Sequence, residues 1–286
     1  MITEYNFQYS DCKKWQFTVD ATPSYISIPE VPNRINSSYS SSSLKQKKFV
    51  LLLRDPVSRH YSEYQRLLRI CFRVIEGDPE LEHPTKTRSP EEKLERSKSN
   101  CALCMRELPL SSSSSSSIVL KKENAMTFSE FVVSPYGSSE LKRGEYLYNI
   151  KRWLKVIDRS QLFIMNFQQL IQNTTCNNNT TNTKMLIILI LILSDMMTRL
   201  SSFLDIDPNK FIKNETQSVI LLPKPPASNS YVNWDPAYLD CKTFDKIDKY
   251  FNKTNAGLIN FINSASNKPK QEPIFEAFTS SRSKCK

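Results

Sequence analysis

Arg54 and Ser62 are the two side chains best suited to bind a phosphate. An arginine presents a planar pair of N–H donors that fits two phosphate oxygens, and a serine hydroxyl can donate one more hydrogen bond to the same group. Ser62 stands eight residues after Arg54. Whether both side chains reach one anion therefore depends on the elements that hold them.

The residues before Arg54 predict a buried strand. Residues 49–53 are a continuous run of Phe, Val and Leu, too short for a helix and apolar on both faces, as expected inside a parallel sheet. Asp55 and Pro56 then favour the start of a helix, because the Asp side chain can cap free backbone donors and Pro fits the first helical turn. Arg54 is thus expected at the carboxyl end of a central strand, where open α/β sheets bind their ligands.

The residues around Ser62 predict an amphipathic helix. Apolar residues recur at three- and four-residue steps and would pack one helix face on the sheet. They are Val57, Tyr61, Tyr64, Leu68 and Cys71. Ser62 then lies about two turns into this helix, so the pair outlines a phosphate site. The alternative is structural: Arg54 caps the sheet edge or pairs with Asp55 or Glu63, and Ser62 faces solvent.

The segment around this pair has a longer pattern, Arg54-Asp55-Pro56-Val57, then Arg59, Tyr61-Ser62 and Tyr64. It resembles the segment by which Golgi carbohydrate sulfotransferases of the glycosaminoglycan type hold the 3′-phosphate of 3′-phosphoadenosine 5′-phosphosulfate (PAPS). In that family the Arg and the Ser contact the phosphate. The resemblance therefore implies PAPS as the cofactor, and Arg54 and Ser62 as the residues that bind it.

Further motifs occur in the order of the same family and extend over most of residues 10–262. The family has an acidic-x-Ser/Thr-Pro-x-Tyr element, a Phe-x-x-Phe-hydrophobic helix, Gly-x-Tyr and Trp-Leu patterns, a late strand and a Phe-Leu pair. The counterparts are Asp20-Ala21-Thr22-Pro23-Ser24-Tyr25, Phe128-Ser129-Glu130-Phe131-Val132, Gly144 with Tyr146, Trp153-Leu154, residues 161–165 and Phe203-Leu204. A set in this order is more specific than any single motif.

The resemblance implies an α/β protein with a P-loop-NTPase-like, three-layer sulfotransferase fold and a central parallel sheet, incomplete at the amino end. The implied reaction moves a sulfuryl group from PAPS to a hydroxyl of a glycosaminoglycan-like carbohydrate. Such a transfer needs a fixed donor, a base for the acceptor proton and positive charge at the leaving phosphate. In the family a Pro-Lys-x-Gly-Thr-Thr-like loop supplies the Lys, and a Glu or His soon after it is the base.

None of these catalytic parts is found in the sequence, so the catalytic residues are unknown. The chain is expected to be truncated at its amino end, which puts its activity as given in question. The four Gly, at 77, 137, 144 and 257, are too far apart for a Gly-rich phosphate loop. Asp20 is expected to be a structural cap, and His60 a surface residue rather than a base. Ala21 stands where some members have Lys, which favours a chondroitin or dermatan acceptor over heparan sulfate.

Two other functions fit the same residues. The first is a catalytically inactive sulfotransferase-like protein that binds nucleotide or acidic polysaccharide. The second is an unrelated basic binding module in which Arg54 and Ser62 are structural. The formal net charge of +10 indicates an anionic partner, whether nucleic acid, acidic membrane or polysaccharide. No RNA-binding aromatic signature, zinc finger or regular basic helix occurs in the sequence, so an acidic glycan is expected and nucleic acid is not.

The resemblance also implies a location in the Golgi lumen or membrane, with membrane association through an amino-terminal anchor that the sequence lacks. In that compartment the seven Cys could form disulfides, for which 101–104 and 241–285 are the pairs considered. Cys101 and Cys104 are a lone CxxC without a nearby His, so no metal site is expected. Six sequons for N-glycosylation agree with a secretory route. They are at Asn36, Asn173, Asn178, Asn179, Asn214 and Asn252.

The expected organisation is one sulfotransferase-like domain over residues 1–263, followed by a basic tail over 264–286. Residues 76–124 are predicted to be a low-complexity surface insertion with one helix at 90–97, and residues 171–184 an Asn/Thr-rich loop.

Shorter elements and one apolar run complete the predictions. Residues 32–35 are expected to lead into a short helix. Further helices are expected at 128–133, 146–157 and 241–263, a buried strand at 162–165, and low-complexity mobile chain at 37–43. Thr127 and Glu130 predict a capping box for the helix at 128–133. The apolar run 185–193 is about half as long as a membrane-spanning helix, which favours a buried helix over a membrane-associated or aggregation-prone segment.

Overall fold

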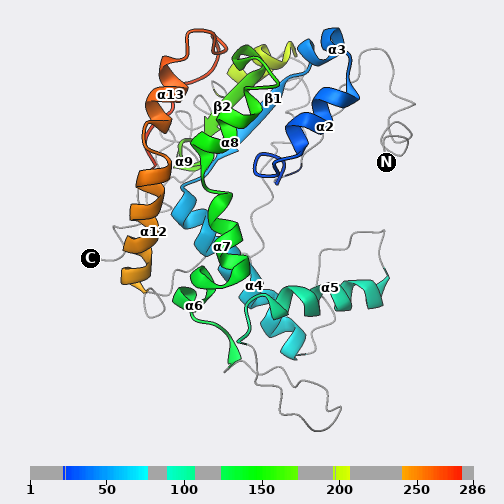
Figure 1. Cartoon of the computed structure of the whole chain (residues 1–286), viewed down its shortest axis with the longest axis vertical. Coiled ribbons are helices and arrows are strands. Elements are labelled where there is room, and N and C mark those ends of the chain that lie inside the picture. The colour runs from blue at the N-terminus through cyan, green and yellow to red at the C-terminus, as the bar shows by residue number, and fades with distance from the viewer. Residues whose placement is uncertain are drawn as a thin grey trace, which may run out of the picture. The chain divides into compact units, whose positions relative to one another are not determined.

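The described part of the chain forms two compact units. The computed structural model describes residues 22, 24–76, 89–106, 124–172, 196, 198–206 and 240–278 (Figure 1). Unit 1 consists of the described residues within 1–53, 146–215 and 255–277, and unit 2 of those within 54–145, 216–254 and 278–286. Each unit has its own buried cluster of apolar side chains.

Unit 1 is built on a parallel pair of strands. β1 (Phe49–Leu53) and β2 (Leu162–Asn166) run side by side, as predicted from their apolar runs (Figure 1). The helices of the unit include α2 (Val31–Ser38), α3 (Ser41–Lys45), α8 (Tyr146–Trp153), the 3-10 helix η2 (Arg159–Gln161), α9 (Phe167–Gln172) and α13 (Leu258–Ser264). Residues 198–204 are also helical. Over the described residues the protein is thus mixed α/β, mostly helical, with a small parallel sheet of two strands.

The two strands differ in burial. All residues of β2 are buried, as predicted for a strand inside a sheet. In β1 the burial alternates, and Val50 and Leu52 are 44% and 43% exposed while Leu53 is buried. Because neighbouring side chains of a strand point to opposite faces, the face of β1 that carries Val50 and Leu52 is partly exposed. The prediction that β1 is buried on both faces is therefore wrong.

A buried ion pair fixes the start of β2. The side chain of Arg159 in η2 pairs with Glu272, and both side chains are almost inaccessible to solvent. Glu272 also accepts a hydrogen bond of 2.9 Å from the backbone N–H of Ile164 in β2. Gln161 donates to the backbone oxygen of Leu44 at 2.7 Å. Separating a buried charge from its partner is costly, so these contacts strongly favour this position of η2 and β2.

Unit 2 is a cluster of helices around α4. It contains α4 (Pro56–Glu76), α5 (Pro90–Ala102), α6 (Phe128–Val133), α7 (Pro135–Lys142) and α12 (Cys241–Thr254). The apolar face predicted for α4 is confirmed, since Val57, Tyr61, Tyr64 and Cys71 are buried and Leu68 packs against the same cluster. Tyr61 meets the ring of Phe128 edge to face at 5.0 Å, and the ring of Phe244 in α12 at 5.2 Å. Within this unit the partners of that face are helices, whereas the sequence predicted packing on the sheet.

Capping boxes explain where α5 and α6 begin. In α6 the hydroxyl of Thr127 accepts from the N–H of Glu130, whose carboxylate accepts from the N–H of Thr127, as predicted. Ser89 and Glu92 form the same arrangement at α5, which runs to Ala102 and so extends beyond the predicted 90–97. Each box satisfies two backbone donors that a helix start would otherwise leave unpaired.

Two predicted segments are corrected by the helix boundaries. Residues 37–43, predicted as mobile, contain the end of α2 and the start of α3, because the hydroxyl of Ser40 accepts from the N–H of Ser43 and caps α3. The single helix predicted over 241–263 is two helices, α12 and α13. Gly257 precedes α13 with φ of 77°, a left-handed conformation that glycine adopts at little cost.

Gly144 of the Gly-x-Tyr motif has a steric role. A Cβ atom at this position would lie 2.5 Å from the ring of Phe251 in α12 and 3.0 Å from the Cβ of Pro56 in α4. Phe251 is buried and Pro56 belongs to the first turn of α4, so a larger residue at this position would have to displace packed atoms. Glycine is therefore required for these two helices to approach the chain at this point.

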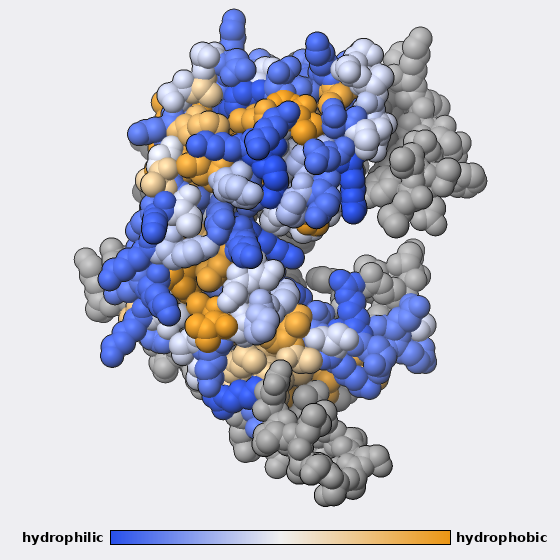
Figure 2. All heavy atoms as spheres, in the orientation of Figure 1, coloured by the Kyte–Doolittle hydropathy of each residue, from blue (hydrophilic) through white to orange (hydrophobic). Residues whose placement is uncertain are grey.

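The face of the protein seen in Figure 2 is mostly polar. Figure 2 shows hydrophilic residues, in blue, over much of the visible face, with apolar residues gathered in smaller areas. The most exposed large apolar side chains are those of Ile274, Val133 and Tyr148. Scattered apolar residues of this kind are normal on a protein surface.

A disulfide joins α4 to α5. Cys71 and Cys101 are bonded, and both are fully buried. Cys104 is a buried free thiol, so the predicted 101–104 pair is wrong. Burial raises the pKa of the Cys104 thiol to about 12. Cys241 is also disulfide-bonded, and Cys285, the partner predicted for it, lies outside the described residues.

Removing the Cys71–Cys101 bond should lower the stability of unit 2. The bond spans a sequence separation of 30, and the entropy it removes from the unfolded chain is worth about 3–4 kcal/mol for such a loop. The double variant Cys71→Ala/Cys101→Ala should therefore unfold at a lower urea concentration, as followed by circular dichroism. Cys104→Ala removes an equally buried sulfur without breaking a disulfide and controls for lost packing. Equal urea midpoints of unfolding for the double variant and this control would show that the disulfide does not stabilise unit 2.

Candidate functional site

The predicted phosphate site lies at the start of α4, where Asp55 caps the helix. Asp55 Oδ2 accepts a hydrogen bond of 2.8 Å from the backbone N–H of Ser58, and the Asp55 carbonyl accepts one of 2.9 Å from the N–H of Arg59. Burial raises the pKa of Asp55, against the opposing effect of the hydrogen bonds from Ser58. Pro56 is the first residue of the helix. The predicted helix start is confirmed.

Arg54 and Ser62 both belong to unit 2 and are both half-buried. Arg54 directly follows the last residue of β1, as predicted, and its charge favours the ionised form of Asp55. Ser62 is the seventh residue of α4, which places it about 9 Å along the helix axis from Pro56. An extended arginine side chain together with an anion of phosphate size can span that distance. That the two side chains meet on one anion stays a prediction.

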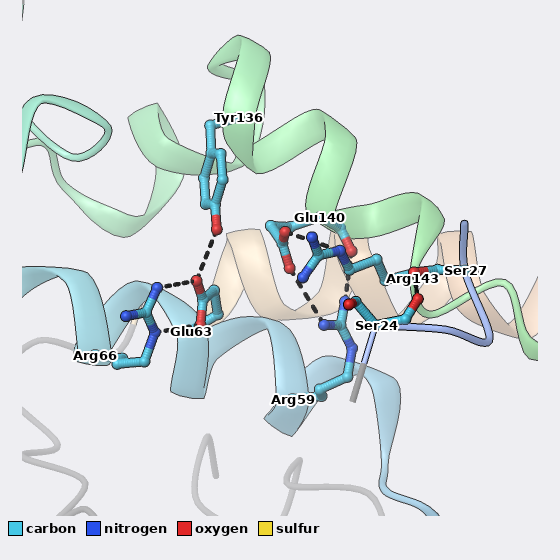
Figure 3. A network of polar contacts seen from close by, with 8 residues as sticks. All are labelled: Ser24, Ser27, Arg59, Glu63, Arg66, Tyr136, Glu140 and Arg143. Carbon is cyan, nitrogen blue, oxygen red and sulfur yellow. Dashed lines mark hydrogen bonds and ion pairs between the residues drawn. The ribbon is translucent and has the colours of Figure 1, made fainter. Parts of the chain in front are cut away.

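Glu63, one of the two alternative partners of Arg54, is held by other residues. Its carboxylate accepts two hydrogen bonds of 2.7 Å from Arg66 and one of 2.8 Å from the hydroxyl of Tyr136 in α7 (Figure 3). Burial raises the pKa of Glu63, but the interactions with Arg66 and Tyr136 outweigh it and lower the pKa overall. Glu63 is therefore charged at neutral pH and ties α4 to α7.

A second carboxylate, that of Glu140 in α7, binds two arginines. Its side chain is 1% exposed and pairs with Arg59 of α4 at 3.3 Å and with Arg143 at 3.1 Å (Figure 3). Arg59 also donates to the backbone oxygen of Glu140. These contacts fasten α4 to α7 at a second point.

Two arginines of α4 are thus paired with carboxylates. Arg59, which belongs to the resembled motif, is bound by Glu140, and Arg66 is bound by Glu63. A guanidinium that already holds a carboxylate has fewer donors for a further anion. Arg59 therefore has a structural role, and Arg54 and Ser62 remain the predicted phosphate contacts.

His60 is a core residue, and the prediction that it lies on the surface is wrong. It has no solvent exposure, and its ring lies 5.4 Å from that of Phe131 and 5.9 Å from that of Phe128. Neither ring nitrogen has a hydrogen-bond partner among the described residues. Burial lowers the pKa of His60 to about 3, and the charge of Arg59 acts in the same direction. His60 is therefore neutral at physiological pH and is not exposed to a substrate.

The downstream motif of the resemblance packs against α4 within unit 2. Phe128 and Phe131 of the Phe-x-x-Phe motif each lie 5.3 Å from the ring of Tyr64. The hydroxyl of Tyr64 donates to the backbone oxygen of Met126 at 2.8 Å. These motif residues are thus explained by the core that they form.

The motif residues of unit 1 are likewise structural where they are described. Trp153 of the Trp-Leu pair donates through Nε1 to the backbone oxygen of Ile26 at 3.3 Å, one residue after Tyr25 of the upstream motif. Phe203 of the Phe-Leu pair lies 5.0 Å from Phe163 in β2. Asp20 and Ala21, on which the expected cap and acceptor preference rest, lie outside the described residues.

A hollow in unit 2 was not predicted from the sequence. It has a volume of about 350 Å³ and is lined by Arg106, Met126, Glu130, Val133, Ser134 and Pro135. Arg106 donates to both carboxylate oxygens of Glu130, at 3.0 and 2.9 Å, which lowers the pKa of Glu130 to about 2. The lowered pKa makes Glu130 a weak base, and its charge is already paired with that of Arg106.

Comparison with known proteins does not add to these observations. No family model, curated protein or solved structure matches the chain. Among the residues that the structure describes, no His, Cys, Asp or Glu side chains gather in groups of three or more that could hold a metal ion. None of the helices described is both long and apolar enough to cross a membrane, and the apolar run 185–193 lies outside the described residues.

The buried neutral His60 predicts a loss of stability on mild acidification. Its pKa is about 3 in the folded state, whereas an imidazole in an unfolded chain has a pKa of about 6.5. Below that pH the unfolded chain binds a proton that the folded chain does not. The free energy of unfolding should therefore fall by up to about 1.4 kcal/mol per pH unit as the pH decreases from about 6.5 towards 3.

Urea unfolding between about pH 7 and pH 5 measures this slope before most carboxylates titrate. The matched variant is His60→Phe, which keeps a ring at the site and removes the titration. Its stability should change less over the same range. An identical slope for wild type and variant would show that His60 is not responsible.

Replacing Glu140 should cost more than replacing an exposed carboxylate. Glu140→Gln leaves Arg59 and Arg143 without their shared partner, and a loss of about 3 kcal/mol is expected, the lower end for buried pairs, because both arginines keep some contact with water. Glu130→Gln is the control, since Gln keeps the capping box and the exposed pair with Arg106 is worth about 0–1 kcal/mol. Unfolding free energies from urea titrations compare the two, and equal losses would contradict the structural role of Glu140.

Proposed function

We propose that this chain is a PAPS-dependent carbohydrate sulfotransferase domain. It transfers a sulfuryl group from PAPS to a hydroxyl of a glycosaminoglycan-like acceptor. Arg54 gives the 3′-phosphate of the donor two charge-assisted hydrogen bonds, and Ser62 gives it one more. These contacts hold the donor in place. The base and the cation for the leaving group are not assigned to residues of this chain.

The observation that carries the proposal is the strand–turn–helix context of the motif. Arg54 stands between the last residue of β1 and the capped start of α4, and Ser62 follows in α4. Ligands of open α/β sheets bind at the carboxyl ends of parallel strands, and β1 pairs in parallel with β2. The finer fold that we propose is the P-loop-NTPase-like, three-layer sulfotransferase arrangement around a central parallel sheet.

The net charge supports an anionic donor and acceptor, and the disulfides support a location in the secretory pathway. A net charge of +10 suits both an anionic donor and an acidic glycan acceptor. The Cys71–Cys101 bond and the disulfide of Cys241 favour an oxidising compartment, because disulfides seldom persist in the cytosol. The location proposed is accordingly the lumen of the Golgi.

A second candidate is a catalytically inactive sulfotransferase-like protein that binds nucleotide or acidic polysaccharide. The titratable groups around the motif favour it, because His60 is buried and neutral while Glu63 and Glu140 are paired with arginines. None of these three is available to take a proton from an acceptor hydroxyl. The donor-binding function of Arg54 and Ser62 is the same in both candidates.

Arg54→Ala should weaken the binding of adenosine 3′,5′-bisphosphate. Hydrogen bonds to a charged group are worth about 1.5–3 kcal/mol, so the Kd should rise by about one to two decades. Ser62→Ala loses one hydrogen bond of about 1 kcal/mol and should raise the Kd about fivefold. Isothermal titration calorimetry on the full chain measures the Kd of the wild type and of both variants.

The matched control is Arg69→Ala. Arg69 is exposed on α4 and donates to the backbone oxygen of Gln65, so this variant removes the same charge away from the predicted contacts. Equal weakening by Arg54→Ala and Arg69→Ala would mean that binding is non-specific, and both candidates would fail. Turnover of labelled PAPS with a chondroitin acceptor then separates the enzyme from the inactive relative.

A further inference from the structure

Asn252 offers a modification site that does not involve the nucleotide motif. Asn252-Lys253-Thr254 are the last three residues of α12 and have the Asn-x-Thr pattern of N-glycosylation. We propose that Asn252 carries an N-linked glycan, added as the chain enters an oxidising secretory compartment. This modification requires that compartment but not sulfuryl transfer.

The sequon lies on the solvent side of α12. The buried residues of this helix are Thr243, Phe244, Ile247 and Phe251, which together form its inner face. Asn252 projects about a third of a turn away from the middle of that face, and it is exposed, as are Lys249 and Lys253. A glycan at Asn252 therefore displaces water rather than packed side chains.

The hydrogen bonds of the sequon are compatible with the modification. Asn252 Nδ2 donates to Asp248 Oδ2 at 3.1 Å, and the hydroxyl of Thr254 donates to the backbone oxygen of Tyr250 at 3.1 Å. The amide nitrogen of asparagine carries two hydrogens, so a glycosylated amide keeps one N–H for Asp248. The fold loses no buried contact when the sugar is attached.

The same contacts indicate that glycosylation precedes the formation of α12. In α12 the amide of Asn252 and the hydroxyl of Thr254 are held by different partners, Asp248 and Tyr250, and so are not presented together to a transferase. The glycan is therefore added to the nascent chain before α12 forms. Folding then accepts the product because Asn252 is exposed.

The group transfer balances without an oxidant or reductant. The Nδ2 atom of Asn252 attacks the anomeric carbon of an oligosaccharide linked to a lipid pyrophosphate. The N–C bond forms while the bond from that carbon to the pyrophosphate oxygen breaks. The lipid pyrophosphate leaves, and one amide proton passes to a base of the transferase.

The disulfides indicate the same compartment independently. Cys241, the first residue of α12, is disulfide-bonded, and the buried Cys71–Cys101 bond lies in the same unit. Oxidised cysteines and N-linked glycans are both acquired along the secretory route. Asn36, in α2 of unit 1, belongs to a second exposed sequon and serves as an internal reference.

Site mapping on the full chain tests the proposal. The chain is directed into the secretory pathway of a eukaryotic host by a fused signal peptide, and the denatured product is treated with peptide-N-glycosidase in heavy-oxygen water. This converts each glycosylated Asn to a labelled Asp, which mass spectrometry locates. We expect the label at Asn252 in most chains. Its absence from chains that have formed the Cys71–Cys101 bond overturns the proposal.

Thr254→Ser and Thr254→Ala provide a matched pair. The Ser variant keeps the hydroxyl that the sequon needs and should retain the label, whereas the Ala variant should lose it, with Asn36 unchanged in both. Because the sugar is added before α12 forms, the result does not depend on either variant folding fully. A label that persists in Thr254→Ala overturns the proposal. Failure of nucleotide binding in the Arg54 experiment would leave this label unaffected.

Discussion

The packing of the aromatic face of α4 is the interaction on which the rest of unit 2 depends. Tyr61 and Tyr64 lie among the rings of Phe128 and Phe244, contributed by α6 and α12. Each large ring removes roughly 150–250 Å² from water, so a small rotation of α4 would expose several rings at once. The same rotation would redirect Ser62, the next residue after Tyr61. The direction of a predicted phosphate contact is thus set by apolar packing and not by the ligand.

Charged groups on α7 add to this constraint. The carboxylates of Glu63 and Glu140 join α4 to α7 through Arg66, Tyr136 and Arg59. Such pairs contribute orientation more than net stability, because removing charges from water offsets much of their attraction. One consequence is that Arg59, grouped by resemblance with a ligand-binding segment, is used to hold two helices together.

Local rules predicted the elements that depend on neighbouring residues. The helix start at Asp55, the capping box at Thr127 and the apolar face of α4 all follow from spacing along the chain. The burial of His60 could also have been found, because it stands three residues after Val57 and so on the same face. By contrast, the Cys71–Cys101 bond and the partly exposed face of β1 depend on which elements approach each other in space. Spacing alone carries no information on such contacts.

Cys104 gives this protein a natural reporter of local opening. Its sulfur is buried just after the end of α5 and donates to the backbone oxygen of Cys101 at 3.3 Å, and the raised pKa keeps it protonated. Alkylating reagents attack the thiolate, and they act from water. This sulfur can therefore be alkylated only while the helices around it separate. The rate of labelling at Cys104 then reports how often the interior of unit 2 opens locally, without any engineered probe.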